Sequence, residues 1–91
     1  MSDDVAVQAV EQEMGRIVRL LVDHPEDVEV ETLTAGRQRI LKVRVRDREV
    51  GQVVGKQGST VTGLRSVLAA LSGKHRVEYQ IEVEGKNGGS R

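Results

Sequence analysis

Residues 53–60 read "VVGKQGST" and place two glycines three positions apart, around Lys56 and Gln57. These residue types suit phosphate binding. Glycine tolerates positive φ angles and lets a ligand backbone approach, lysine adds a positive charge, and glutamine both donates and accepts hydrogen bonds. The N-terminal N–H groups and the dipole of a helix that followed this bend would also favour an anion. The bend is therefore a candidate phosphate-binding loop, and an ordinary glycine-rich turn between helices is the alternative.

The familiar nucleotide-binding loops do not fit this stretch. A P-loop needs four residues between its first glycine and a Gly-Lys pair that is followed by Ser or Thr. Here three residues separate Gly51 from Gly55, and Gln57 follows Lys56. The dinucleotide pattern fails as well, because no G-x-G precedes the last glycine and no predicted strand enters the bend. The bend therefore predicts neither a nucleotide hydrolase nor a dehydrogenase.

The chain offers little for catalysis or metal binding. Its two histidines, His24 and His75, fall in predicted turns, and neither has a His, Cys or Asp at triad or ligand spacing. Asp23 is only a sequence neighbour of His24, and we expect both histidines to be solvated. Without cysteine there is no disulfide and no thiolate metal site. The sequence predicts no enzyme, no cofactor and no metal.

Length and composition predict one domain in a reducing setting. Ninety-one residues suit a single small core, and a cysteine-free mixture of charged and aliphatic residues is typical of the cytoplasm. No apolar run reaches the roughly 20 residues of a membrane span, and the acidic start does not read as a signal peptide. We therefore expect a soluble, cytoplasmic protein that does not contact membranes.

The formal net charge of zero conceals a strong segregation of charge along the chain. Residues 1–35 carry nine acids and two bases, whereas residues 36–76 carry ten bases and two acids. A basic block of this kind is an electrostatic candidate for a phosphate-bearing partner, and the bend lies inside it. Solvated faces are the alternative explanation for most of these side chains.

Hydrophobic periodicity predicts the elements that position the bend. Apolar residues recur with helical spacing over 3–23, where Ser2 is the expected N-cap and Pro25 limits the C-terminal end. Alternating residues predict strands near 28–32 and 41–45. A weak short helix over 47–54, with Asp47 as its N-cap, precedes the bend.

An amphipathic helix is expected over 61–71, in which Gly63 suggests tight packing and "SGKH" marks the end. A third strand is expected near 77–83, with Tyr79 facing the core. Residues 85–91 are expected to form a flexible tail.

This order of elements, together with Val54 to Val61, resembles the KH domain, whose signature is Ile-Gly-x-x-Gly-x-x-Ile between two helices. The stretches "LVDHPEDVEV" and "VGQVVGKQGSTVTGLR" resemble the small single-domain bacterial KH proteins of the KhpA group. The resemblance spans residues 5–83. It implies an α+β fold of KH type II over residues 1–84, ordered helix-strand-strand-helix-GxxG-helix-strand, with three helices packed on one face of a three-stranded sheet.

The resemblance further implies a single-stranded RNA-binding protein that acts as a post-transcriptional regulator or RNA chaperone. In KH domains a cleft holds about four nucleotides while the loop clamps their backbone. A single tyrosine excludes an aromatic stacking platform, but an aliphatic cleft floor needs none. Ser59 stands where relatives often carry a basic residue, and Ser72 to Arg76 are expected to form the second wall. The expected RNA-binding residues are Gly55, Lys56, Gln57 and Gly58 in the clamp, Ser59 beside it, Val50, Gly51 and Val54 on the floor, and Arg65, Lys74 and Arg76 as further phosphate contacts.

The alternative function is a protein-interaction module. The resemblance implies pairing as a homodimer, or as a heterodimer with another KH protein of the Jag type, in RNA regulation and the control of cell shape and envelope growth. The acidic helix over 3–23 is the candidate docking face. Salt distinguishes the two functions, because phosphate binding weakens steeply as salt rises and an apolar interface changes little.

Overall fold

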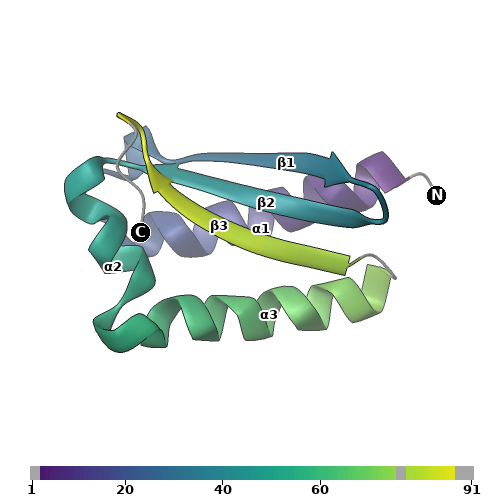
Figure 1. Ribbon diagram of the computed structural model, residues 1–91. Helices are drawn as coiled ribbons and strands as arrows, with labels where there is room; N and C mark the ends of the chain where they lie inside the picture. Colours follow the sequence, from purple (N-terminus) through teal and green to yellow (C-terminus); the bar gives the residue numbers. More distant parts are fainter. Residues whose placement is uncertain (1–2, 76–77, 88–91) are drawn as a thin grey trace.

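The computed structural model describes residues 3–75 and 78–87. Three α-helices and three strands follow the predicted order, and single 3₁₀ turns lead into β1, α2 and α3 (Figure 1). The α+β arrangement expected for a KH domain is confirmed. The helices are α1 (Asp3–Leu21), α2 (Val50–Val54) and α3 (Ser59–His75), and the strands are β1 (Glu29–Ala35), β2 (Gln38–Val45) and β3 (Glu78–Gly85).

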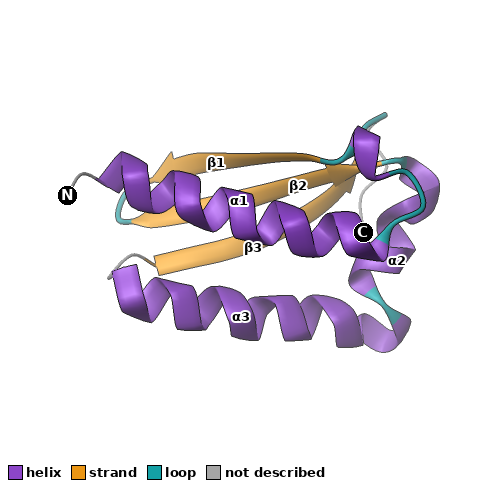
Figure 2. Ribbon diagram, turned by 180° about the vertical axis from the view of Figure 1, so that it is seen from behind, coloured by secondary structure: helices purple, strands orange, loops and turns teal. Residues whose placement is uncertain are grey.

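The three strands form one sheet in the order β1-β2-β3. A hairpin turn at Gly36, which has a φ of 65°, joins β1 to its antiparallel partner β2, and β3 returns parallel to β2 after the helical segment. Figure 2 shows α1 and α3 side by side over one face of the sheet, with α2 at one end of this helical layer. No helix of residues 3–75 covers the other face, and β3 is an edge strand whose outer side borders α3.

The core between the sheet and the helical layer is almost entirely aliphatic. Inward residues of neighbouring strands lie in register, as Val30 does opposite Val43 and Leu41 opposite Ile81. Each fully buried Val, Leu or Met side chain stabilises the fold by about 1.5–3 kcal/mol relative to an exposed one. The largest fully buried side chains are Met14, Leu41, Leu68, Val10, Val18, Val43, Val45 and Val53. Among the helices of residues 3–75, none is long and apolar enough to cross a membrane.

Several predicted boundaries are wrong because hydrogen bonds that the periodicity does not reveal decide them. Helix α1 ends at Leu21 rather than at residue 23, and the next residues bond to the start of α2 instead. Helix α3 continues through the "SGKH" stretch to His75, and Ser72 Oγ donates to the carbonyl of Leu68 at 2.8 Å, a bond that a helix accommodates. Strand β3 includes Gly85, and the next N–H, of Lys86, donates to the carbonyl of Val45 at 2.9 Å. The chain thus remains bonded to the sheet beyond the predicted start of the tail.

Two predictions about individual residues are also wrong. Asp47 caps no helix: its Oδ1 accepts from the backbone N–H of Asn87 at 3.2 Å, and α2 begins without a side-chain cap. Gly63 is exposed, and a Cβ built on it would meet nothing within 4 Å, so tight packing does not explain this glycine. The expected N-cap, Ser2, lies outside the described residues.

Candidate nucleic-acid interface

The two glycines of the bend are needed for different reasons. Gly55 ends α2, donates its N–H to the carbonyl of Gly51 at 2.8 Å and has φ 79° and ψ 171°, a region that essentially only glycine occupies. A Cβ there would also lie 2.2 Å from Oγ1 of Thr60. Gly58 has a φ of 77°, but a Cβ would meet nothing within 4 Å. Gly55 is therefore fixed by both backbone and packing, whereas Gly58 leaves open space beside the chain.

Gln57 takes a left-handed backbone conformation, with φ 56° and ψ 28°. Among the described residues, Gln57 is the one non-glycine residue with a positive φ. The N–H of Gly58 donates to the carbonyl of Gly55, and that of Ser59 to the carbonyl of Lys56. The N–H groups of Lys56 and Gln57 have no acceptor within the described part of the chain, and both side chains are exposed. The loop thus presents two backbone donors and a lysine to solvent.

A groove lies between the helical layer and the outer edge of β3. Its first part has a volume of about 480 Å³ and lies between the α2–α3 corner and β3, and its second part, of about 290 Å³, lies between α3 and the start of β3. Both parts contain Arg65 and Ile81. We call the combined surface the β3 groove. It is lined by Val54, Val61, Arg65, Leu68 and Ala69 from the helices, Tyr79, Gln80, Ile81, Glu82, Val83 and Glu84 from β3, and Lys42 from β2.

The structure brings together only some of the predicted site residues. Val54 and Arg65 line the β3 groove next to the loop. Val50, expected on the cleft floor, is a core residue with 3% exposure, because α2 turns it toward the sheet. Gly51 is exposed but lines neither part of the groove. Ser59 is exposed at the first position of α3, beside the loop as expected.

Residues 72–75 of the expected second wall are helical. Lys74 lies in the last turn of α3, about 22 Å along the helix from Ser59. The structure therefore separates Lys74 from the clamp, and Arg76 lies outside the described residues. Sequence reasoning missed Ile81, Val83 and Glu82 as groove residues, because their alternation identifies a strand but not its position at the sheet edge.

The basic block does not form one positive surface. Arg44 lies between Glu31 of β1, at 3.7 Å, and Glu84 of β3, at 3.6 Å, because both neighbouring strands place acids beside it. Lys42 also pairs with Glu84, at 3.2 Å. Within residues 3–75 and 78–87, neither Lys56 nor Arg65 has an ion-pair partner. The free positive charge closest to the groove therefore belongs to these two residues.

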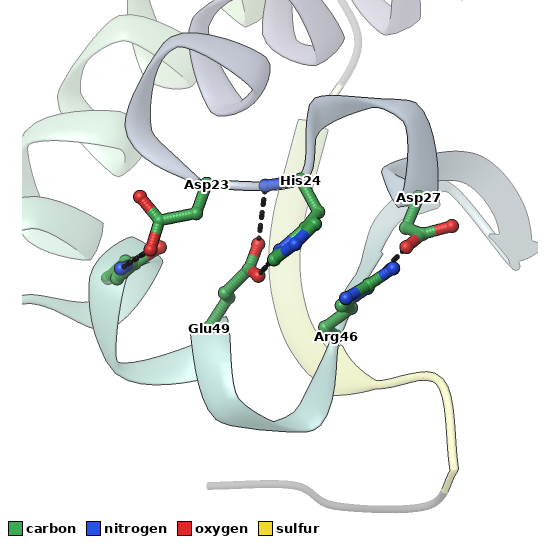
Figure 3. A network of polar contacts seen from close by, with 6 residues as sticks. Asp23, His24, Asp27, Arg46 and Glu49 are labelled. Carbon is green, nitrogen blue, oxygen red and sulfur yellow. Dashed lines mark hydrogen bonds and ion pairs between the residues drawn. The ribbon is translucent and has the colours of Figure 1, made fainter.

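Polar contacts fasten the turn after α1 to the segment before and within α2 (Figure 3). Glu49, only 4% exposed, accepts from the backbone N–H of His24 at 3.1 Å and contacts His24 Nδ1 with its other oxygen. Gln52 Nε2 donates to Asp23 Oδ2 at 3.0 Å. His24 is thus half-buried and bonded, so the expectation of a solvated turn residue is wrong. No local pattern in the sequence indicates this pairing, because 25 residues separate the two partners.

An ion pair joins the same turn to the end of β2. Arg46 Nε donates to Asp27 Oδ2, and this hydrogen bond is the main cause that holds the pKa of the Asp27 carboxyl below its usual value. The same bond raises the pKa of the Arg46 guanidinium. This pair contacts neither the loop nor the β3 groove.

Comparison with known proteins agrees with the fold. A family model described as "KhpA/KhpB, KH domain" matches residues 11–83. A Mycobacterium tuberculosis protein named "RNA-binding protein KhpA" is 40% identical over 70 residues, which cover 77% of this chain and 82% of that protein. Proteins of the same name from Leifsonia xyli and Streptomyces coelicolor are each 37% identical, over 75% and 71% of this chain and 90% and 82% of their own lengths. No solved structure matches. With the KH element order and the GxxG loop in place, the chain belongs to the KhpA/KhpB family of KH domains.

Proposed function

We propose that this protein binds single-stranded RNA, with the RNA backbone held at residues 55–58 and the bases in the β3 groove. The observation that carries the proposal is the pair of backbone N–H groups at Lys56 and Gln57 that lack an acceptor in the described chain, beside a lysine without an ion-pair partner. Val54, just before the loop, lines the β3 groove together with Val61, Ile81 and Val83, so part of the groove lining is aliphatic. The name of the relatives, RNA-binding protein, is consistent with this function.

In this proposal the loop binds the RNA phosphate and the β3 groove binds the bases. A phosphate at the loop receives hydrogen bonds from the backbone of Lys56 and Gln57 and faces the N-terminal end of α3, whose dipole favours an anion. The adjacent bases rest on aliphatic side chains such as Val54 and Ile81. Arg65, which belongs to both parts of the groove, is placed to contact a second phosphate or to stack on a base.

We expect the isolated domain to bind RNA weakly. A single domain that engages few phosphates has modest affinity, which a second RNA-binding domain raises through effective concentration. We therefore propose a cytoplasmic post-transcriptional regulator or RNA chaperone, whose partner proteins supply additional RNA contacts.

The test is fluorescence anisotropy of a short unstructured RNA with the parent and with the double variant Lys56→Asp and Gln57→Asp. The matched control is Gln12→Asp with Arg16→Asp, which makes the same change in net charge on the exposed side of α1. We expect the loop variant to lose at least about tenfold in affinity and the control to lose far less, because one phosphate contact and its backbone donors are worth about 1–3 kcal/mol. Equal affinities of the two folded variants would contradict the proposal.

Protein association is the second candidate function, and the apolar surface of α1 favours it. Leu20 is 85% exposed at the end of this helix, and Val5 is 51% exposed near its start. We propose a homodimer, or a heterodimer with a KH protein of the Jag type, that uses this helix. Analytical ultracentrifugation of the parent and of Leu20→Glu tests the proposal: a partner-dependent complex that the substitution abolishes supports it, and an unchanged complex contradicts it.

A further inference from the structure

Helix α2 carries the loop but has little intrinsic stability. It spans five residues, three of which are valines and one a glycine, and both residue types are poor helix formers. A helix of this length does not persist in water without tertiary contacts. Val50 and Val53 bind one side of α2 to the core. The opposite, polar side needs its own support if Gly55 is to keep a fixed position.

That support comes from the turn after α1. Glu49, the residue before α2, is the one buried charged side chain among the described residues, and its two oxygens contact the backbone N–H and the ring Nδ1 of His24. One turn further, Gln52 bonds to Asp23. Figure 3 shows these contacts side by side, reaching from one turn to the beginning and the middle of α2.

We infer that Glu49 and His24 are positioning residues for the RNA clamp: their contact fixes α2, and α2 in turn fixes the loop at residues 55–58. This inference rests on the proposed function, because it names residues that act on RNA binding without touching RNA. Neither residue lines the β3 groove. A buried carboxylate that kept only a general stabilising role would affect folding without altering the geometry of the loop.

The sign of the charge effect makes the inference testable. Glu49→Ala removes a negative charge, and by electrostatics alone this strengthens the binding of a polyanion. We expect the opposite result, an RNA affinity about tenfold weaker, because the two contacts of Glu49 with His24 are lost and only the bond between Gln52 and Asp23 still joins α2 to the turn. The matched control is Asp27→Asn. It also removes one carboxylate, from the turn after α1, but it weakens only the contact of that turn with Arg46 at the end of β2.

Graded variants of His24 separate the ring contact from the backbone contact. His24→Leu removes the ring donor and leaves the backbone N–H in place, so we expect a loss of about threefold. His24→Asn places an amide nitrogen where Nδ1 stands and should restore affinity to within about twofold of the parent. This rescue would not occur if the site required only the bulk of the side chain. His24→Leu also keeps the test possible if Glu49→Ala does not fold.

A second measurement uses the free protein and does not depend on RNA. The amide of Gly55 donates the last hydrogen bond of α2, so its hydrogen exchange reports how firmly the helix holds the loop. We expect exchange at Gly55 to rise about tenfold in Glu49→Ala and to stay near the parent value in Asp27→Asn. Equal exchange in these two variants would overturn the inference even if the parent did not bind RNA. If the parent binds RNA, equal affinities of Glu49→Ala and Asp27→Asn would overturn it as well.

Discussion

At the scale of single residues, the GKQG loop shows what a sequence can and cannot reveal about a site. Two glycines three apart predict a bend, but not that Thr60 occupies the space where a side chain on Gly55 would lie, while Gly58 faces open space. Nor do they predict that Gln57, between the two glycines, also takes a left-handed conformation. Such details depend on which side chain from α3 meets the loop, and spacing alone does not contain that information.

The two glycines should therefore respond differently to alanine. Gly55→Ala combines a glycine-only backbone region with an overlap at Thr60, so we expect a loss of about 3 kcal/mol or more in the free energy of unfolding. Gly58→Ala adds only the cost of a positive φ, about 1 kcal/mol. Chemical denaturation of both variants measures the difference, and equal stabilities would show that the contact with Thr60 is unimportant.

Asp27 gives a prediction about acid. Because Arg46 lowers the pKa of the Asp27 carboxyl in the folded state, the ionised form stabilises the fold above the usual value of 3.8, and this contribution disappears as pH falls through the lower folded pKa. We expect Asp27→Asn to be less stable than the parent at pH 7 and the difference to vanish at pH values below the folded pKa. Thermal denaturation across this range is the measurement. A difference that persisted in strong acid would mean that the carboxylate charge is not the cause.

At the scale of elements, periodicity predicted the existence and order of the helices and strands, and side-chain bonds set their ends. The alternation at Val77, Tyr79, Ile81 and Val83 identified a strand without revealing that it is the edge beside α3. Likewise, the sequence "SGKH" looked like a helix stop, yet α3 continues through it and carries Lys74 away from the loop. Boundaries and edges depend on tertiary neighbours, and for that reason the sequence did not show that residues 72–75 continue α3.

The sequence suggested tight packing at Gly63, and an alanine substitution tests that suggestion. Gly63 lies within α3, and a Cβ at this position would have no neighbour within 4 Å, so alanine should gain its full helix propensity. We expect Gly63→Ala to stabilise the fold by about 1 kcal/mol, which corresponds to a rise of about 4–8 °C in Tm. A destabilised variant would indicate that the backbone at Gly63 is closely covered, as the sequence suggested.

At the scale of the whole molecule, folding brings together acidic and basic residues that lie in separate stretches of the sequence. Strand pairing brings acids of β1 and β3 next to the bases of β2, as at Glu31, Arg44 and Glu84. Linear charge blocks therefore overstate the positive surface available to RNA. The sequence located the loop correctly, but it could not show which of the ten basic residues in the stretch 36–76 would be neutralised by a neighbouring strand.

The salt dependence of RNA binding should reflect this pairing. If Lys56 and Arg65 are the two phosphate contacts, log K should fall with log salt at a slope of about −1.4, since single strands give about −0.7 per phosphate. If all ten Lys and Arg side chains of residues 36–76 contacted phosphates, the same rule would give a slope near −7. Anisotropy titrations at several salt concentrations distinguish these values, and a steep slope would mean that the ion pairs on the sheet open when RNA binds.

The most direct test of the RNA clamp is a ¹H–¹⁵N correlation spectrum of the protein titrated with a short unstructured RNA. We predict that the largest shifts occur at the amides of residues 55–58 and along the β3 groove at Val61, Arg65 and Ile81, while Lys74 and the open face of the sheet change little. Shifts confined to the open face, or spread evenly over the surface, would contradict the proposed clamp and would place any RNA contact away from the GKQG loop.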